Sequence, residues 1–250
     1  MAGAMKKGVV AYIVVLHCLL VVVLVKTDFV VRVGRMIGVC SPAYVYKGPR
    51  ILADKMQSFY ERVDKNVPKG SVIVIGDSLV QGLCVGSVCL GDAKRIAVGF
   101  GIGGDTLEGI TTRLKRLSAT LSASIIVVEG GVNDLFTGAS DDEFKARYLN
   151  LLDAIPQGIP FVSVLMFPVM DGRWSVGNDR IEQLNRWISD KVSEKGGRVC
   201  DIGRVLLDNG ELSSRYHIGD GLHLNREGNA LFMERLQEII MHEMKNRESK

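Results

Sequence analysis

Apolar residues gather in five short runs between residues 71 and 202, and polar or glycine-rich segments separate the runs. Short apolar runs of this kind predict strands that are buried on both faces of a sheet. The five expected strands are residues 71–75, 96–100, 125–128, 161–167 and 198–202.

Between these runs, apolar residues recur at spacings of three and four, which is typical of helices that bury one face. A first helix is expected to follow Pro49, and Asn225 can cap the last one. Ser140 and Glu143 form a capping-box pattern that opens another helix. Alternating strands and helices predict an α/β fold, with helices on both faces of a parallel sheet. We expect one domain over residues 70–248.

The first 69 residues have a different pattern. Residues 1–8 are basic, residues 9–25 are apolar apart from His17, and residues 26–69 are expected to hold a stalk and the first helix. As a helix, the apolar run would be about 26 Å long, at the short end of what crosses a bilayer. No small residues of a cleavage site follow it. We therefore expect an uncleaved, single-pass transmembrane helix rather than a cleaved signal peptide.

The net charge is +3, and the basic excess lies at the N-terminus, where residues 1–35 hold five basic side chains against Asp28. The rest of the chain has no basic stripe, which excludes a nucleic-acid binder. Basic residues flank the apolar run on both sides, and their slight excess after it favours a cytoplasmic C-terminus. The cysteines favour the opposite orientation. Cys84 and Cys89 are close enough in sequence to form a disulfide in an oxidising compartment, with two buried thiols as the alternative. We expect the domain to be extracytoplasmic, either periplasmic or extracellular.

Residues with useful chemistry follow the predicted strands, at the edge where a parallel sheet binds its ligands. Ser78 comes shortly after the first strand. A serine hydroxyl is a weak nucleophile and needs a base that is oriented by a third group. His223 is the expected base, because Asp220 precedes it by three residues and a tight turn can bring the two side chains together. We prefer it to His217 for this reason.

A nucleophilic serine also needs hydrogen-bond donors for the oxyanion that develops on its substrate. Gly104 lies in a turn where the backbone can approach a substrate closely, and Asn133 offers an amide N–H after the third strand. Each also has an ordinary explanation, a left-handed turn for Gly104 and a turn amide for Asn133. The chain has no P-loop and no zinc-ligand spacing, and we expect neither a cofactor nor a metal.

Four ordered motifs, taken together, resemble the sequence blocks of the SGNH, or GDSL, hydrolase family. They are GDSL (76–79), GIGGDT (101–106), GVND (131–134) and DGLHLN (220–225), and the resemblance spans about residues 70–245. It implies a flavodoxin-like, three-layer α/β/α fold around a five-stranded parallel sheet, and hydrolysis of esters, thioesters or acyl groups on sugars.

The resemblance also implies a role for each candidate residue. Ser78 would be the nucleophile, with Asp220 and His223 as the other members of a catalytic triad. Gly104 and Asn133 would form the oxyanion hole together with the backbone N–H of Ser78. The chain departs from many members at position 99, where it has glycine instead of asparagine, which leaves the support of the Gly104 turn open.

The expected function is therefore a serine esterase that cleaves acetyl or short acyl groups from glycans, or lipid esters, through an acyl-serine intermediate. An acyltransferase would use the same site and differ only in whether water or an acceptor hydroxyl reaches the acyl-enzyme. Gly99, Gly101 and Gly104 also match a dinucleotide fingerprint with Glu129 beyond them, which would indicate an oxidoreductase. A membrane-tethered binding module without catalysis is the remaining alternative.

Overall fold

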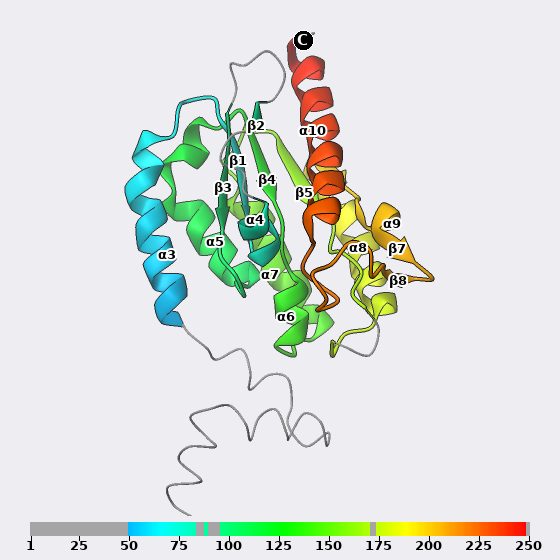
Figure 1. The fold of residues 1–250 in the computed structure, drawn as a ribbon. Helices are drawn as coiled ribbons and strands as arrows, with labels where there is room; N and C mark the ends of the chain where they lie inside the picture. Colours follow the sequence, from blue (N-terminus) through cyan, green and yellow to red (C-terminus); the bar gives the residue numbers. More distant parts are fainter. Residues whose placement is uncertain (1–49, 84–87, 90–95, 171–173, 249–250) are drawn as a thin grey trace, which may run out of the picture. The chain divides into compact units, whose positions relative to one another are not determined.

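The computed structural model describes residues 50–83, 88–89, 96–170 and 174–248. Its centre is a six-stranded sheet in the order β2-β3-β1-β4-β5-β6 (Figure 1). The five strands β3, β1, β4, β5 and β6 are parallel, and β2 is antiparallel to β3. The strands are β1 (Val72–Gly76), β2 (Val88–Cys89), β3 (Ile96–Gly101), β4 (Ile125–Val128), β5 (Phe161–Val164) and β6 (Arg198–Cys200).

The parallel strands follow the chain order 2-1-3-4-5, which is the flavodoxin-like arrangement. Each predicted strand is confirmed in its place, and so is the five-stranded parallel sheet. The chain adds β3 on one side of β1 and β4, β5 and β6 on the other, so the strand order reverses next to β1. The carboxyl ends of β1, β3 and β4 form the edge where such folds bind ligands.

Helices cover both faces of the sheet, which confirms the three-layer architecture. The helices α3, α5, α7 and α8 pack on one face, and α4, α9 and α10 pack on the other. The helices are α3 (Arg50–Val63), α4 (Ser78–Gly82), α5 (Leu107–Arg116), α6 (Val132–Phe136), α7 (Asp141–Ala154), α8 (Asn178–Glu194), α9 (Gly203–Leu206) and α10 (Arg226–Glu248). Short 3₁₀ turns follow α3 and α5 at Asp64–Asn66 and Ser118–Ser122.

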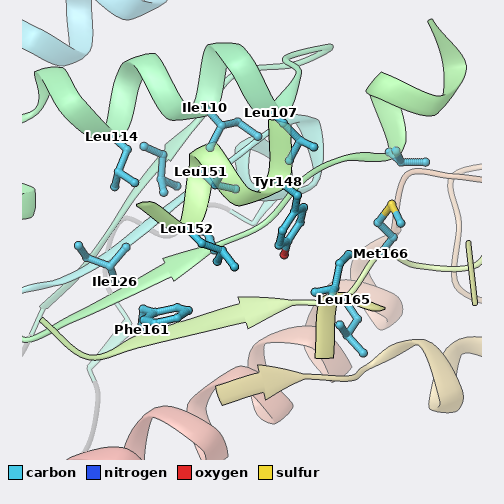
Figure 2. Close-up of a cluster of buried hydrophobic side chains, with 14 of the residues drawn as sticks. Leu107, Ile110, Leu114, Ile126, Tyr148, Leu151, Leu152, Phe161, Leu165 and Met166 are labelled. Carbon is cyan, nitrogen blue, oxygen red and sulfur yellow. The ribbon is translucent and has the colours of Figure 1, made fainter. Parts of the chain in front are cut away.

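The core follows from the alternation of side chains along the strands. In β1, Ile73 and Ile75 face one layer of helices while Val72 and Val74 face the other, and all four are fully buried. Figure 2 shows the first of these two clusters, in which leucines and isoleucines of α5 and α7 pack over the sheet.

Two of the predicted helix starts have the expected caps. The hydroxyl of Ser140 accepts from the N–H of Glu143, and the Glu143 carboxylate accepts from the N–H of Ser140, which completes the capping box. The Asn225 side chain accepts from the N–H groups of Glu227 and Gly228 at the start of α10.

Several boundaries and elements differ from the sequence prediction. The strand expected over 161–167 ends at Val164, and the one expected over 198–202 ends at Cys200. Beyond Leu165, whose N–H donates to the Cys200 carbonyl, residues 166–169 pair with no strand among the described residues, although they stay buried. Residues 165–169 are apolar because they are buried, although they belong to no strand. The sequence analysis also missed β2 and the hairpin of β7 (Leu207–Asp208) and β8 (Glu211–Leu212).

The predicted anchor over residues 9–25, the stalk up to residue 48 and Cys84 lie outside the described residues. Within the described part of the chain, no helix combines the length and the apolar character that a bilayer crossing requires.

Candidate active site

Ser78 is the first residue of α4, directly beyond the carboxyl end of β1. The Asp77 carboxylate caps this helix by accepting the N–H of Leu79 at 2.9 Å. The helix lies very close to β3, because a Cβ atom at Gly101 would come within 2.2 Å of the Gln81 nitrogen. Glycine at this point of β3 therefore allows α4 to hold Ser78 at the edge of the sheet.

The structure brings Ser78, His223 and Asp220 together over a sequence separation of 145 residues. Nε2 of His223 lies 2.9 Å from the Ser78 hydroxyl oxygen, and Nδ1 lies 2.6 Å from Oδ2 of Asp220. About a third of the His223 and Asp220 side chains is exposed, 33% and 34%. The proton that Nδ1 donates to the carboxylate leaves Nε2 as an acceptor for the serine hydroxyl.

The charge state of Asp220 suits this arrangement. Partial burial alone would raise the pKa of the Asp220 carboxyl, but three hydrogen bonds outweigh that effect and hold the pKa below its usual value. One bond comes from the His223 ring, and the backbone N–H groups of Leu222 and His223 both donate to Oδ1 at 3.0 Å. Asp220 is therefore a carboxylate at neutral pH and favours a positive charge on the neighbouring imidazole.

Gly104 lies in a left-handed turn with φ of 75°, beside the start of α4. The turn is tied to that helix, because the N–H of Gly103 donates to the Gln81 side chain at 2.7 Å. Among the described residues, the backbone N–H groups of Ser78 and Gly104 have no hydrogen-bond acceptor. They are free to bind an anion.

Arg113 supports the turn that carries Gly104, a support that the glycine at position 99 had left open. Its side chain is 1% exposed, and its guanidinium donates to the carbonyls of Phe100 at 3.0 Å and Gly76 at 2.6 Å. It also pairs with the Asp105 carboxylate. One buried cation thus connects the ends of β1 and β3 with the turn that carries Gly104.

Asn133 lies at the start of α6, with its side chain buried beside the same turn. Its Nδ2 group donates to Oδ2 of Asp77 at 3.0 Å and to the carbonyl of Asp105 at 2.9 Å. Both amide hydrogens therefore have partners within the protein. The side chain is more than a turn amide that bonds its own backbone, since its partners Asp77 and Asp105 belong to two other motifs.

A pair of buried carboxyl groups lies beneath Ser78. Glu129 follows β4, accepts the N–H of Asp77 at 3.2 Å and is hydrogen-bonded to the Asp77 carboxyl. Burial raises the pKa of Asp77 to about 6 and that of Glu129 well above its usual value, and the nearby Asp77 charge adds to the Glu129 shift. Because Glu129 is 3% exposed and paired in this way, it is not available to bind a ribose, as a dinucleotide site would require.

Asp134, the neighbour of Asn133, has a different environment. Its Oδ2 accepts the N–H of Leu107 at 2.8 Å, at the first turn of α5, and its Oδ1 accepts from Arg147 at 2.9 Å. Burial raises the pKa of Asp134, and these two bonds limit the rise. Asp134 thus fastens α5, and with it the end of the Gly104 turn, to α6 and α7.

Sequence reasoning missed several polar residues that shape the site. Arg113 was given no role, although its place beside Ile110 and Leu114 on the apolar face of α5 was a signal. His217 and Trp174 support the loop of Asp220, and no local pattern distinguishes them. Among the described residues, no group of three or more His, Cys, Asp or Glu side chains is placed to hold a metal ion.

Comparisons with known proteins agree with this fold. A structure from Streptococcus pneumoniae, described as that of a platelet activating factor, superposes with a TM-score of 0.67 at 19% identity and covers 74% of this chain and 91% of its own. A carbohydrate esterase family 3 structure from Talaromyces cellulolyticus gives a TM-score of 0.53 at 17% identity, covering 71% and 99% of the two chains. At such identities the likeness concerns the fold alone.

Sequence comparison also finds a relative that is named for a different activity. An N-acylneuraminate cytidylyltransferase of Streptococcus agalactiae is 30% identical over 162 residues, which are 61% of this chain and 38% of that protein. This chain therefore corresponds to well under half of the relative's length. The profile of the GDSL-like lipase/acylhydrolase family matches residues 74–231, from β1 into α10, and includes all four motifs. The chain belongs to the GDSL-like lipase/acylhydrolase family.

Proposed function

We propose that this chain is a serine esterase that cleaves carboxylic esters through an acyl-serine intermediate. The observation that carries the proposal is the hydrogen-bonded series of Ser78, His223 and Asp220, with distances of 2.9 and 2.6 Å, at the carboxyl end of β1. The same series of groups performs acyl transfer on several unrelated folds.

In the first half of the proposed reaction, Oγ of Ser78 attacks the ester carbonyl and Nε2 of His223 takes the hydroxyl proton. The Asp220 carboxylate stabilises the imidazolium that results. When the tetrahedral intermediate collapses, the C–O bond to the leaving alcohol breaks and His223 returns the proton to that alcohol. In the second half, His223 activates a water molecule, which attacks the acyl-serine and releases the carboxylic acid and free Ser78.

The oxyanion of each tetrahedral intermediate needs donors that are already in place. We assign this role to the backbone N–H groups of Ser78 and Gly104, which have no acceptor among the described residues. Asn133 is the third proposed donor. Its N–H toward the Asp105 carbonyl would be shared with the oxyanion, which as a charged acceptor competes well with a neutral carbonyl.

The proposed substrates are acetyl or short acyl esters on a sugar, with lipid esters as the second class. Two names among the similar proteins favour sugars, a carbohydrate esterase of the same fold and a relative that acts on an N-acylneuraminate. Neither name is evidence for cytidylyl transfer here, since the match covers 38% of that relative.

A series of p-nitrophenyl esters of increasing chain length, followed by acetylated sugars, would test this proposal. Wild-type protein should hydrolyse the acetyl ester fastest, and a fluorophosphonate probe should label Ser78. The Ser78→Ala variant should lose both labelling and turnover while keeping the wild-type melting temperature. Labelling or turnover that persists in this variant would contradict the proposal. Product analysis with and without a sugar acceptor separates hydrolysis from acyl transfer by the same site.

We also propose that residues 9–25 anchor the chain as a single-pass membrane protein, with the domain outside the cytoplasm. Full-length protein should remain in the membrane fraction after a carbonate wash, and a chain that begins near Lys47 should be soluble and active. A soluble mature protein whose N-terminus lies beyond residue 25 would show a cleaved signal instead. Thiol labelling of Cys84 and Cys89 without reductant, expected to fail, tests the oxidising compartment.

A further inference from the structure

The loop that carries Asp220 and His223 is closed like a small hairpin. His217 and Leu224 form an isolated antiparallel bridge at its base, and the N–H of Ile218 donates to the carbonyl of His223 at 2.9 Å. Asp220 lies at the tip, between Gly219 and Gly221, which have φ values of 101° and 76°. The carboxylate of Asp220 thus depends on two peptides in a left-handed conformation that few other residues adopt.

The imidazole of His217 holds both of these peptides. Its Nδ1 accepts the N–H of Gly219 at 2.9 Å and the N–H of Gly221 at 3.2 Å. The residue is 8% exposed, so the ring lies inside the loop. A single nitrogen atom therefore fixes the backbone on either side of Asp220.

These two hydrogen bonds determine the tautomer of His217, and that tautomer carries a cost in stability. An Nδ1 atom that accepts two hydrogen bonds carries no proton, so the proton lies on Nε2. Nε2 is buried and has no hydrogen-bond partner among the described residues. A buried donor without an acceptor costs about 1–3 kcal/mol of stability. Such groups are rare in native proteins and call for an explanation other than stability.

Two contacts from other segments hold the outer side of the loop. The Trp174 indole donates to the Asp220 carbonyl at 3.0 Å, and the N–H of Met170 donates to the Gly221 carbonyl at 2.9 Å. Both contacts bind carbonyl groups. The N–H groups on the inner side of the same turn are bound by the His217 ring.

We propose that His217 is a positioning residue, whose neutral imidazole binds the peptides on both sides of Asp220 and so aims its carboxylate at Nδ1 of His223. The inference rests on the proposed function, because it assumes that Asp220 acts through His223. It gives His217 a positioning role and leaves the sequence-based assignment of His223 as the base unchanged. A carboxylate displaced by about 1 Å can lower turnover by as much as a hundredfold.

The test compares His217→Leu, which removes the acceptor, with His217→Asn, whose side-chain oxygen takes nearly the place of Nδ1. His242→Leu in the exposed part of α10 is the matched control. We expect His217→Leu to lower kcat for p-nitrophenyl acetate by at least tenfold with KM within about threefold, and to slow fluorophosphonate labelling of Ser78 to a similar extent. His217→Asn should recover kcat to within about threefold of wild type, and His242→Leu should match wild type.

A folded His217→Leu variant with wild-type kcat would overturn the inference, and so would equal losses in the Leu and Asn variants. Should His217→Leu fail to fold, His217→Gln replaces it, because the Gln oxygen lies nearer the position of Nε2. The Gln variant should then be at least tenfold slower than the Asn variant, and equal rates would overturn the inference. Ser78→Ala keeps the two proposals apart. Full activity in that variant contradicts the esterase, whereas an inactive Ser78→Ala with a fully active His217→Leu contradicts only the role of His217.

Discussion

The carboxyl groups of Asp77 and Glu129 are hydrogen-bonded to each other beneath the residue proposed as nucleophile, and both are almost completely buried. Two carboxyls can bond in this way only when one of them keeps its proton. The hydrogen bonds assign that proton to Glu129. The N–H of Leu79 and Nδ2 of Asn133 donate to Asp77 and so favour its ionised form. Burial raises the pKa of Glu129 well above its usual value and that of Asp77 to about 6. Asp77 then accepts from Glu129, from Leu79 and from Asn133, which connects the pair to the proposed oxyanion hole.

This pair makes the stability of the fold depend on pH. Because the pKa of each group is higher in the folded state than in the unfolded chain, its contribution is complete at low pH and is lost as the pH rises through the folded-state pKa. For Asp77 that loss falls between about pH 4 and pH 6, and for Glu129 it begins near pH 4.5 and extends further up. Each unit of pKa shift corresponds to about 1.4 kcal/mol.

We expect Glu129→Gln to become more stable relative to wild type as the pH rises from 4.5 to 8. The amide cannot ionise, and its NH2 and carbonyl groups can take the places of the donor and the acceptor of a protonated glutamate. Urea unfolding of both proteins at several pH values measures the difference. Glu129→Leu, which removes the donor to Asp77, should be less stable than Glu129→Gln at every pH. A Gln variant whose advantage does not change with pH would show that Glu129 is ionised in the fold.

His223→Ala should abolish esterase turnover, since it removes the imidazole whose Nε2 lies 2.9 Å from the Ser78 hydroxyl and takes its proton. Asp220→Asn should be less severe, lowering kcat by about three to four orders of magnitude, because the imidazole remains but its preferred tautomer changes. Steady-state kinetics on p-nitrophenyl acetate gives both values. Equal rates for His223→Ala and wild type would mean that another residue is the base.

Asn133→Ala should lower kcat by about a hundredfold with KM changed only slightly, if its amide donates to the oxyanion in the transition state. The hydrogen bonds to Asp77 and Asp105 add a cost in stability of about 1–3 kcal/mol, since the buried Asp77 carboxylate loses a donor. Kinetics measured well below the melting temperature separates the two effects. A near-normal kcat would leave the oxyanion to the two backbone N–H groups.

Asp134→Ala should behave in the opposite way to its neighbour. It removes the acceptor of the Leu107 N–H and the partner of Arg147, so we expect a loss of about 1–3 kcal/mol in unfolding free energy. The kcat of the folded fraction should stay within about threefold of wild type. Asp134→Asn, which keeps an acceptor for Leu107, should recover part of the stability. A large fall in kcat at unchanged stability would place Asp134 in the reaction itself.

Gly101→Ala should disturb the site through the backbone. The added methyl group would lie 2.2 Å from the nitrogen of Gln81 and 2.7 Å from its Cα, so α4 would have to move away from β3 and carry Ser78 with it. We expect both a lower melting temperature and at least a tenfold lower kcat. The control is Gly82→Ala, where a Cβ would meet no atom of the described residues within 4 Å and activity should stay within about threefold.

Local pattern determined the elements of this fold and the identity of its chemical groups. Burial on both faces requires apolar, β-branched strands, so Val72, Ile126 and Val162 reveal their strands without knowledge of their neighbours. The capping signals at Ser140 and Asn225 act within a few residues and were predicted correctly for the same reason. The four motifs lie after strands or before the last helix, which sufficed to single out Ser78, Gly104, Asn133, Asp220 and His223.

Only the tertiary structure decided what each buried polar group binds. Contacts with other segments decide where β5 ends and that β2 pairs antiparallel with β3. Distant segments and the paths of loops decide the partners of Arg113, Glu129 and His217. Arg113 reaches Gly76 across 37 residues, and Asp77 meets Glu129 across 52. A hydrophobic period reports which face of an element is buried, because that property repeats along the chain. The partner of a buried donor or acceptor has no such repeat, and it exists only once the segments have been packed against one another.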